Sequence, residues 1–148
     1  MYDHILIATD GSELARKGVE HGLDLASRLG SRVTIVSVTT PLDPSAVQAA
    51  LEGGVEDPVG SYDRTVAEEM KQRFAALERQ ASDKGVKVEL THEIDEHPAE
   101  AIVRLAERLR CDLIVMSSHG RRGLRRLVLG SQTAEVVTHT TIPVLVVR

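Results

Sequence analysis

Short apolar runs alternate along the chain with longer segments in which apolar residues recur at helical spacing. The apolar runs predict strands at His4–Ala8, Val33–Val38, Val86–Leu90, Asp112–Ser117 and Pro143–Val147. The segments between them predict helices over about 12–30, 62–84, 98–109 and 131–140. Strands that alternate with helices indicate a parallel sheet wrapped on both faces. The pattern therefore predicts an α/β fold with three layers, αβα, in one domain over residues 1–148.

Two segments stand apart from this regular alternation. Residues 40–60 show little periodicity and contain Pro41, Pro44, Gly53, Gly54, Pro58 and Gly60. We expect a long loop there, which in a compact domain is usually functional, a lid or disordered. The run Val86–Leu90 alternates apolar and polar residues, which favours a position at the edge of the sheet.

Composition narrows the class of protein. The chain of 148 residues has 2% aromatic residues and a net charge of −4, so neither stacking on single-stranded nucleic acid nor attraction to anionic partners is favoured. The single cysteine, Cys111, excludes an internal disulfide and a cysteine-based metal site, and its place beside a buried strand favours an inert residue. The start of the chain is unlike a signal peptide and no apolar run approaches about 18 residues. We expect a cytoplasmic protein that binds neither nucleic acid nor membrane.

Candidate chemistry lies at the ends of the first and fourth strands. The fourth strand runs into Met116-Ser117-Ser118-His119-Gly120, and after nine residues Gly130-Ser131 opens the last helix. Backbone N–H groups at such places bind anions, phosphate above all. The first strand ends in Thr9-Asp10-Gly11. If the strand order is 3-2-1-4-5, both strand ends meet where the order reverses, which is where ligands bind in such sheets.

The chain lacks the sequence motifs of two well-known phosphate-binding loops, but it resembles another family. The chain has neither G-x-x-x-x-G-K-[ST] nor a G-x-G-x-x-G after its first strand. The run Ser117-Ser118-His119-Gly120, nine residues and Gly130-Ser131 resembles the universal stress protein family, whose nucleotide-binding members carry G-x-x-G, nine residues and G-[S/T]. Matching segments extend from Ile5 to Val147. The resemblance implies a Rossmann-like sheet of five parallel strands in the order 3-2-1-4-5.

The resemblance also implies a ligand, ATP with Mg²⁺, and roles for particular residues. Adenine would pack near Ala8, Thr9 and Val38. The residues after Met116, namely Ser117, Ser118 and His119, would line the ribose and phosphates, and Asp10 would face the ribose or a phosphate-bound Mg²⁺. The phosphates would be held by Gly120, Gly130, Ser131 and Gln132, with Arg121 and Arg122 in reach. The family's members dimerise through the last strand, here Val144, Leu145, Val146 and Val147.

Each of these assignments has a plainer alternative. Asp10 could cap the first helix, Gly120 and Gly130 could be turn or cap glycines, and the arginines at 121, 122, 125 and 126 could form a solvated loop face. Ser117 stands where the motif has glycine: a positive φ there would cost roughly 1–2 kcal/mol, whereas an extended strand end would cost little and add a hydroxyl. No nucleophile–base pair is evident around His119, which disfavours catalysis.

These observations support three hypotheses. The first is a nucleotide-responsive regulatory or stress-resistance protein that is not an enzyme. The second is a slow ATPase or a protein that phosphorylates itself, with Thr9, Ser118 or Ser131 as acceptor but no base that the sequence identifies. The third is a ligand-free interaction module that dimerises through the apolar edge Val144–Val147, which would otherwise invite aggregation.

Overall fold

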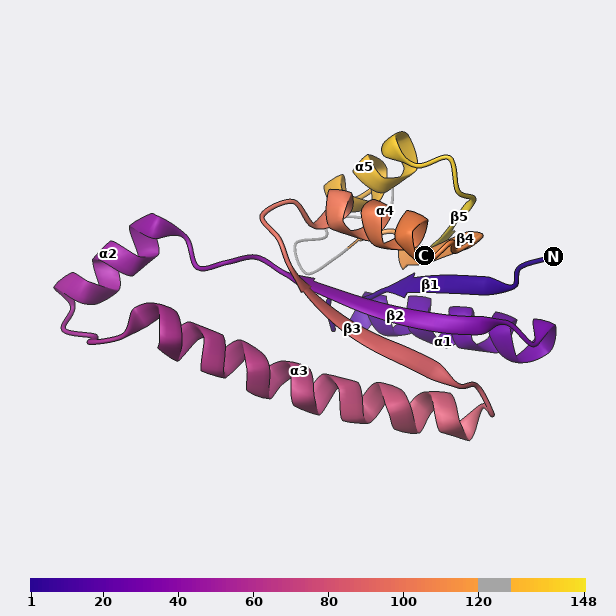
Figure 1. The fold of residues 1–148 in the computed structure, drawn as a ribbon, viewed down its shortest axis with the longest axis horizontal. Coiled ribbons are helices and arrows are strands. Elements are labelled where there is room, and N and C mark those ends of the chain that lie inside the picture. Colours follow the sequence, from indigo (N-terminus) through magenta and orange to yellow (C-terminus); the bar gives the residue numbers. More distant parts are fainter. Residues whose placement is uncertain (120–128) are drawn as a thin grey trace.

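The strands of the described residues lie in one parallel sheet (Figure 1). The computed structural model describes residues 1–119 and 129–148. The sheet has five strands in the order β3-β2-β1-β4-β5, and each neighbouring pair is parallel. The strands are β1 (His4–Ala8), β2 (Arg32–Thr39), β3 (Val88–Ile94), β4 (Leu113–Ser117) and β5 (Val144–Val147). The expected order 3-2-1-4-5 is confirmed, so the order reverses between β1 and β4.

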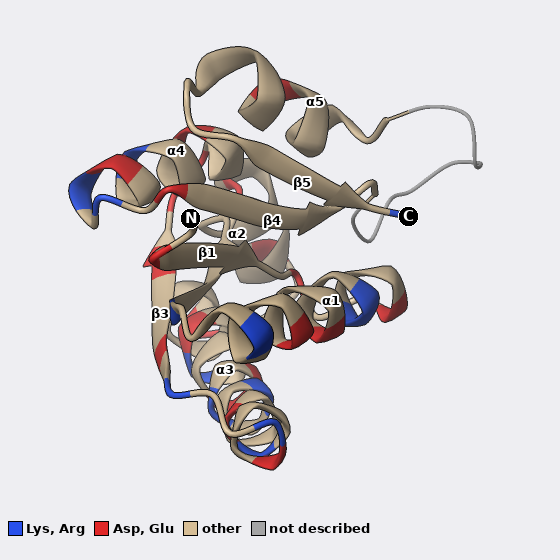
Figure 2. Ribbon diagram, turned by 90° about the vertical axis from the view of Figure 1, so that its right-hand side faces the viewer, with Lys and Arg blue, Asp and Glu red and all other residues tan. Residues whose placement is uncertain are grey.

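Helices cover both faces of the sheet, which confirms the three-layer architecture. In Figure 2, α4 (Pro98–Arg108) and α5 (Ser131–His139) lie on one side of the sheet, and α1 (Glu13–Leu29) and α3 (Pro58–Asp83) lie on the other. Side chains of β1 alternate between the two resulting cores. Ile5 and Ile7 pack against α1 and α3, whereas Leu6 and Ala8 pack against α4 and α5. A strand buried on both faces is largely apolar, which is why Ile5–Ala8 of β1 form a continuous apolar run.

The expectation of a loop over residues 40–60 is wrong. This segment forms the helix α2 (Pro44–Glu52) and the start of α3 at Pro58 rather than near Tyr62. Both prolines stand in the first turn of a helix, where the missing N–H costs nothing. The side chain of Asp43 accepts a hydrogen bond from the Ser45 N–H, and that of Asp57 accepts one from Gly60. No residue of α2 is buried, and the prolines and glycines that flank the short helix are what made the segment resemble a loop.

The third strand also differs from its expected bounds. It spans Val88–Ile94 instead of residues 86–90, because its length is set by pairing with β2, from Val33 opposite Val88 to Thr39 opposite Ile94. Val86 is buried but belongs to the turn, where its N–H donates to the Ala81 carbonyl oxygen. The expected edge position of this strand is confirmed.

Two boundaries of α1 illustrate how local sequence ends a helix. The Ser12 side chain caps the start, with the Ala15 N–H donating to its Oγ at 3.1 Å. Gly30 ends the helix with a φ of 71°, a left-handed conformation that glycine adopts without strain.

Within the described residues, no helix is both long and apolar enough to cross a membrane.

Candidate functional site

A pocket lies at the carboxyl ends of β1, β2 and β4, on the face that α4 and α5 cover. Its empty space, counted out into the open solvent, is about 510 Å³. Its inner wall is apolar and its rim is polar. The lining residues are Ala8, Thr9, Asp10, Val36, Val38, Pro98, Ile102, Met116, Ser117, Gln132 and Thr133. The ends of the first and fourth strands therefore meet at the expected crevice.

The structure brings together part of the predicted set of residues. Those that line the pocket are Ala8, Thr9, Asp10, Val38, Met116, Ser117 and Gln132. The predicted residues Ser118, His119, Gly130 and Ser131 adjoin these in sequence but are not among the lining residues. Gly120, Arg121 and Arg122, with Arg125 and Arg126, lie outside the described residues.

Four lining residues were missed by sequence reasoning: Val36, Pro98, Ile102 and Thr133. Val36 could have been found, because it lies two residues before Val38 and so shares its face of β2. Pro98 and Ile102 come from α4, which starts at the carboxyl edge of the sheet after the crossover from β3. No local signal in the sequence marks that start as part of a pocket.

The turn from β1 to α1 is held by its own polar side chains. The Ser12 N–H donates to Asp10 Oδ1 at 2.9 Å, and the Gly11 N–H donates to Thr9 Oγ1 at 3.2 Å. Ser12, and not Asp10, caps the helix. The expectation that Asp10 could cap the first helix is therefore wrong; its carboxylate orders the turn and lines the pocket, and its role toward a ligand stays a prediction.

Arg73 of α3 supports this turn from the other face of the sheet. Its Nη1 donates to Ser37 Oγ at 3.2 Å, and Ser37 Oγ in turn donates to the Thr9 carbonyl oxygen at 2.9 Å. Gly11 has a φ of 77°, and a Cβ there would lie only 2.5 Å from Arg73 Nη2, so the guanidinium lies directly against the turn. Sequence reasoning missed Arg73, because nothing distinguishes it from the other charged residues of α3.

The end of β4 decides between the two expectations for Ser117. Among the described non-glycine residues a positive φ occurs at Arg110 and not at Ser117. Ser117 is a strand residue, so a serine in place of the motif's glycine carries no backbone strain. Its hydroxyl donates to the His119 carbonyl oxygen at 2.8 Å, and its own carbonyl accepts from Thr133 Oγ1 at 2.8 Å.

Gly130 is needed for close packing rather than for backbone freedom. Its φ of −58° and ψ of 150° suit any residue. A Cβ, however, would lie 3.0 Å from the Ser118 carbonyl oxygen and 3.2 Å from His119 Cα. The Gly130 N–H donates to that same Ser118 oxygen at 2.7 Å, so in this structure it bonds the protein and not a ligand. The next N–H groups of α5, at Ser131 and Gln132, have no acceptor within the helix.

His119 is buried beside this contact and touches a hydroxyl. Its Nδ1 lies 3.1 Å from Ser118 Oγ, and its Nε2 has no partner among the described residues. The same type of contact joins His4 to Thr34 in the core, at 2.9 Å, and His92 to Thr39, at 2.7 Å. A histidine–hydroxyl contact therefore occurs at several places in this fold and does not by itself identify a catalytic pair.

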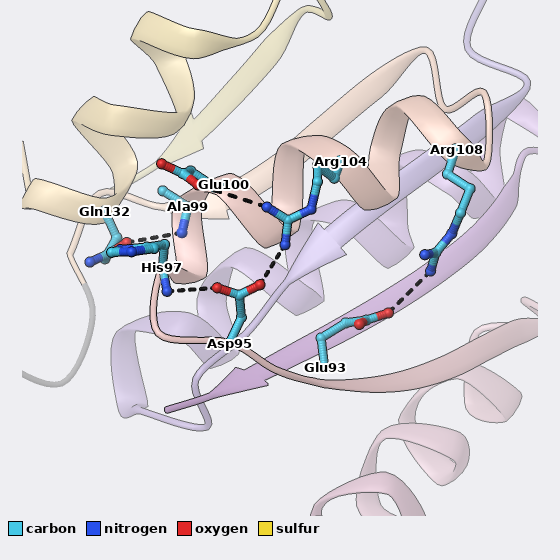
Figure 3. A network of polar contacts seen from close by, with 8 residues as sticks. All are labelled: Glu93, Asp95, His97, Ala99, Glu100, Arg104, Arg108 and Gln132. Carbon is cyan, nitrogen blue, oxygen red and sulfur yellow. Dashed lines mark hydrogen bonds and ion pairs between the residues drawn. The ribbon is translucent and has the colours of Figure 1, made fainter. Parts of the chain in front are cut away.

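The N-termini of α4 and α5 are joined at the rim of the pocket (Figure 3). The Gln132 Oε1 accepts from the Ala99 N–H at 3.1 Å. Asp95 precedes α4; it accepts from the His97 N–H at 2.8 Å and forms an ion pair with Arg104. The hydrogen bond from His97 and, after it, the contact with Arg104 hold the pKa of Asp95 below its usual value. These bonds order the segment that presents Pro98 to the pocket.

No group of three or more histidine, cysteine or acidic side chains suited to a metal ion occurs within residues 1–119 and 129–148. Asp10 is the acidic residue among those that line the pocket. A metal ion held by protein side chains alone therefore does not fit these residues. An ion that takes most of its ligands from a bound phosphate would fit, because Mg²⁺ commonly uses one or two carboxylates with phosphate oxygens and water.

Comparison with known proteins gives one consistent family. The profile of the universal stress protein family matches residues 1–148. Universal stress protein MJ0531 of Methanocaldococcus jannaschii is 32% identical over all of this chain and 83% of its own. The solved structure of MJ0577 from the same organism has a TM-score of 0.81 and 29% identity, covering 99% of this chain and 96% of that one.

More distant structures share the fold and are complexes with nucleotides. A universal stress protein in complex with cAMP has a TM-score of 0.70 and 20% identity, over 99% of this chain and 97% of that one. The universal stress protein of Archaeoglobus fulgidus in complex with dAMP has a TM-score of 0.65 and 16% identity, over 99% and 98%. At these identities the likeness establishes the shared architecture.

Proposed function

This chain belongs to the universal stress protein family, and we propose that it binds ATP, with Mg²⁺, in the pocket at the ends of β1 and β4. We propose further that it acts in the cytoplasm as a nucleotide-responsive regulatory or stress-resistance protein and not as an enzyme. The observation that carries the proposal is the pocket itself: an apolar wall beside a polar rim where two helices begin. Family members in complex with cAMP and dAMP support an adenine nucleotide as the class of ligand.

The apolar wall suits a nucleobase. Ala8, Val36 and Val38 come from neighbouring strands, and Ile102 and Met116 complete the wall from α4 and β4. Flat aromatic bases gain affinity by burial against such side chains. Asp10 at the rim offers carboxylate oxygens, which accept hydrogen bonds from the hydroxyl groups of a ribose.

The start of α5 suits the phosphates. Helix N-termini combine unpaired N–H groups with the positive end of the helix dipole. Since the Gly130 N–H already donates to Ser118, the donors proposed for phosphate are the Ser131 and Gln132 N–H groups and the Ser131 hydroxyl. The roles assigned to Gly120, Arg121 and Arg122 by resemblance remain part of this proposal.

Mg²⁺ would neutralise charge on the bound phosphates. Among the residues described at the pocket, Asp10 is the side chain that would hold the ion, together with phosphate oxygens and water. Binding of the nucleotide would shift the protein toward a state that a downstream partner recognises, provided the two states differ in affinity for the nucleotide.

The experiment is a titration of the protein with ATP and Mg²⁺ by calorimetry, comparing wild type with Asp10→Asn. Asparagine keeps an oxygen for the Ser12 N–H but loses the charge and the metal ligand. We expect Asp10→Asn to bind ATP–Mg²⁺ at least about tenfold more weakly, the effect of roughly 1.4 kcal/mol. Asp43→Asn is the matched control, because Asp43 makes the same kind of turn with the Ser45 N–H at the start of α2. No heat with wild type at millimolar ATP would refute the proposal.

Phosphate release separates binding from turnover. We propose that ATP stays intact on the protein over hours, since the hydroxyl–imidazole contact of Ser118 and His119 resembles two structural pairs elsewhere. Release of phosphate above background, lost in Asp10→Asn, would show instead that the protein is an ATPase.

We propose that the protein is a homodimer joined through β5. This strand is at the end of the sheet order, and Val144, Leu145, Val146 and Val147 are each partly exposed. An apolar edge strand is a template for pairing, and pairing with a second copy closes it. Light scattering at micromolar concentration should give twice the mass of one chain, and Val146→Lys should give a monomer. A monomeric wild type would contradict this.

A further inference from the structure

Helix α4 begins without a cap of its own. Its N-cap residue, His97, makes no side-chain hydrogen bond to the first turn. The cap comes instead from α5, where Gln132 Oε1 accepts from the Ala99 N–H at 3.1 Å (Figure 3). A backbone N–H can only donate, so the oxygen of the Gln132 amide, and not its nitrogen, must face Ala99. The orientation of the amide is thereby fixed, and its NH₂ group is turned away from α4.

Of the three hydroxyl groups among the described lining residues, those of Ser117 and Thr133 already donate their protons within the protein. Ser117 Oγ donates to the His119 carbonyl oxygen, and Thr133 Oγ1 donates to that of Ser117. Toward a ligand these two hydroxyls can therefore act only as acceptors, like the Asp10 carboxylate. Among the described side chains that line the pocket, N–H or O–H protons remain on Thr9 and Gln132, and Gln132 supplies the amide.

Gln132 also lies where negative charge is favoured. It is the second residue of α5 and is exposed at the rim, beside the N–H groups of the first turn. Two helix N-termini, those of α4 and α5, are joined through its side chain. A ligand acceptor at this point is stabilised by both helix dipoles if it is an anion.

We propose that the Gln132 side chain determines specificity for the phosphate of the bound nucleotide: held by Ala99, its NH₂ group donates to a phosphate oxygen. This inference rests on the proposed function. It assigns to Gln132 a role beyond its main-chain N–H, and it links occupation of the pocket to the cap of α4. The amide selects nucleotides over nucleosides, because a nucleoside has no phosphate for it to bind.

The test compares ATP with adenosine, each titrated into wild type and Gln132→Glu. Glutamate keeps an oxygen for the Ala99 N–H, so the melting temperature without ligand should stay the same or rise. It loses the donor and places a carboxylate beside the phosphates. We expect ATP affinity to fall by about tenfold to a hundredfold, the scale of a hydrogen bond to a charged group. Affinity for adenosine should change by less than about twofold.

A second variant separates capping from recognition. In Gln132→Ala combined with His97→Ser, the serine can cap α4 locally. This double variant should melt close to wild type and still bind ATP weakly. If Gln132→Glu binds ATP as wild type does, or loses ATP and adenosine equally, the inference is wrong although the proposed function stands. If wild type itself binds neither ATP nor adenosine, both the inference about Gln132 and the proposed function are wrong.

Discussion

Replacing Gly130 by alanine tests the close contact between the start of α5 and the end of β4. The new Cβ would lie 3.0 Å from the Ser118 carbonyl oxygen and 3.2 Å from His119 Cα. Both are backbone atoms, which cannot rotate away as a side chain could. Alanine tolerates the φ of −58° and ψ of 150° found there, so its own conformation adds no strain. The helix must therefore move by a few tenths of an ångström, which weakens the 2.7 Å hydrogen bond from the Gly130 N–H to Ser118.

The expected loss of stability follows from this crowding. Forcing an extra methyl group into a packed site costs about 1–3 kcal/mol. For a chain of this length each kcal/mol lowers the melting temperature by about 2–4 °C, so we expect a decrease of roughly 2–12 °C. Urea unfolding followed by circular dichroism measures the free energy directly. Because the N–H groups of Ser131 and Gln132 move with the helix, the affinity for ATP should fall as well.

Gly30→Ala is the matched control. Gly30 has a φ of 71°, and a Cβ there would meet no atom within 4 Å. The cost is conformational, about 1–2 kcal/mol, and arises at the far end of α1. The two variants should lose similar stability, while only Gly130→Ala loses affinity for ATP. If Gly130→Ala unfolds at the same urea concentration as wild type, the contact is not the reason for glycine. Equal losses of ATP affinity in both variants would show that the effect is not local.

Three further predictions test other parts of the structure. Arg73→Ala removes the donor to Ser37 and the support of the β1–α1 turn, so ATP affinity should fall in calorimetry while Arg79→Ala, on the same helix, leaves it unchanged. The hydrogen bond from the His97 N–H and the contact with Arg104 lower the pKa of Asp95 in the folded protein, so its carboxylate stabilises the fold above its unfolded pKa, and this stability is lost as pH falls through the folded pKa. Asp95→Asn should be less stable than wild type in urea at pH 7, and the difference should shrink as pH falls below the unfolded pKa of about 4. A difference that does not change with pH would contradict this. Burial raises the pKa of the Cys111 thiol to about 11, so a thiol reagent at pH 8 should label the protein only after unfolding, and prompt labelling of the native protein would show that this strand end opens.

Much of the fold was predictable because its signals are local. Strands β1 and β4 are buried on both faces, and a continuous apolar run is enough to identify such a strand. Helix α1 was predicted from an apolar stripe between the Ser12 cap and Gly30. The helix α2 was missed because it is short and packs no residue into the core, and because the proline in its first turn resembles a break unless Asp43 is recognised as a cap.

The candidate site likewise has features that local sequence predicts and features that only tertiary contacts determine. The sequence by itself determined which strand ends carry small and polar residues, and with the order of strands this placed Asp10 and Ser117 at one pocket. Only the tertiary structure decided that Ser117 is extended, that the Gly130 N–H is taken by Ser118, and that Arg73 supports the turn from the opposite face. It also joined Gln132 to Ala99, 33 residues apart in the chain. Periodicity and caps depend on residues within a turn or two of each other, whereas these contacts depend on how separate helices pack across the sheet, which no local pattern encodes.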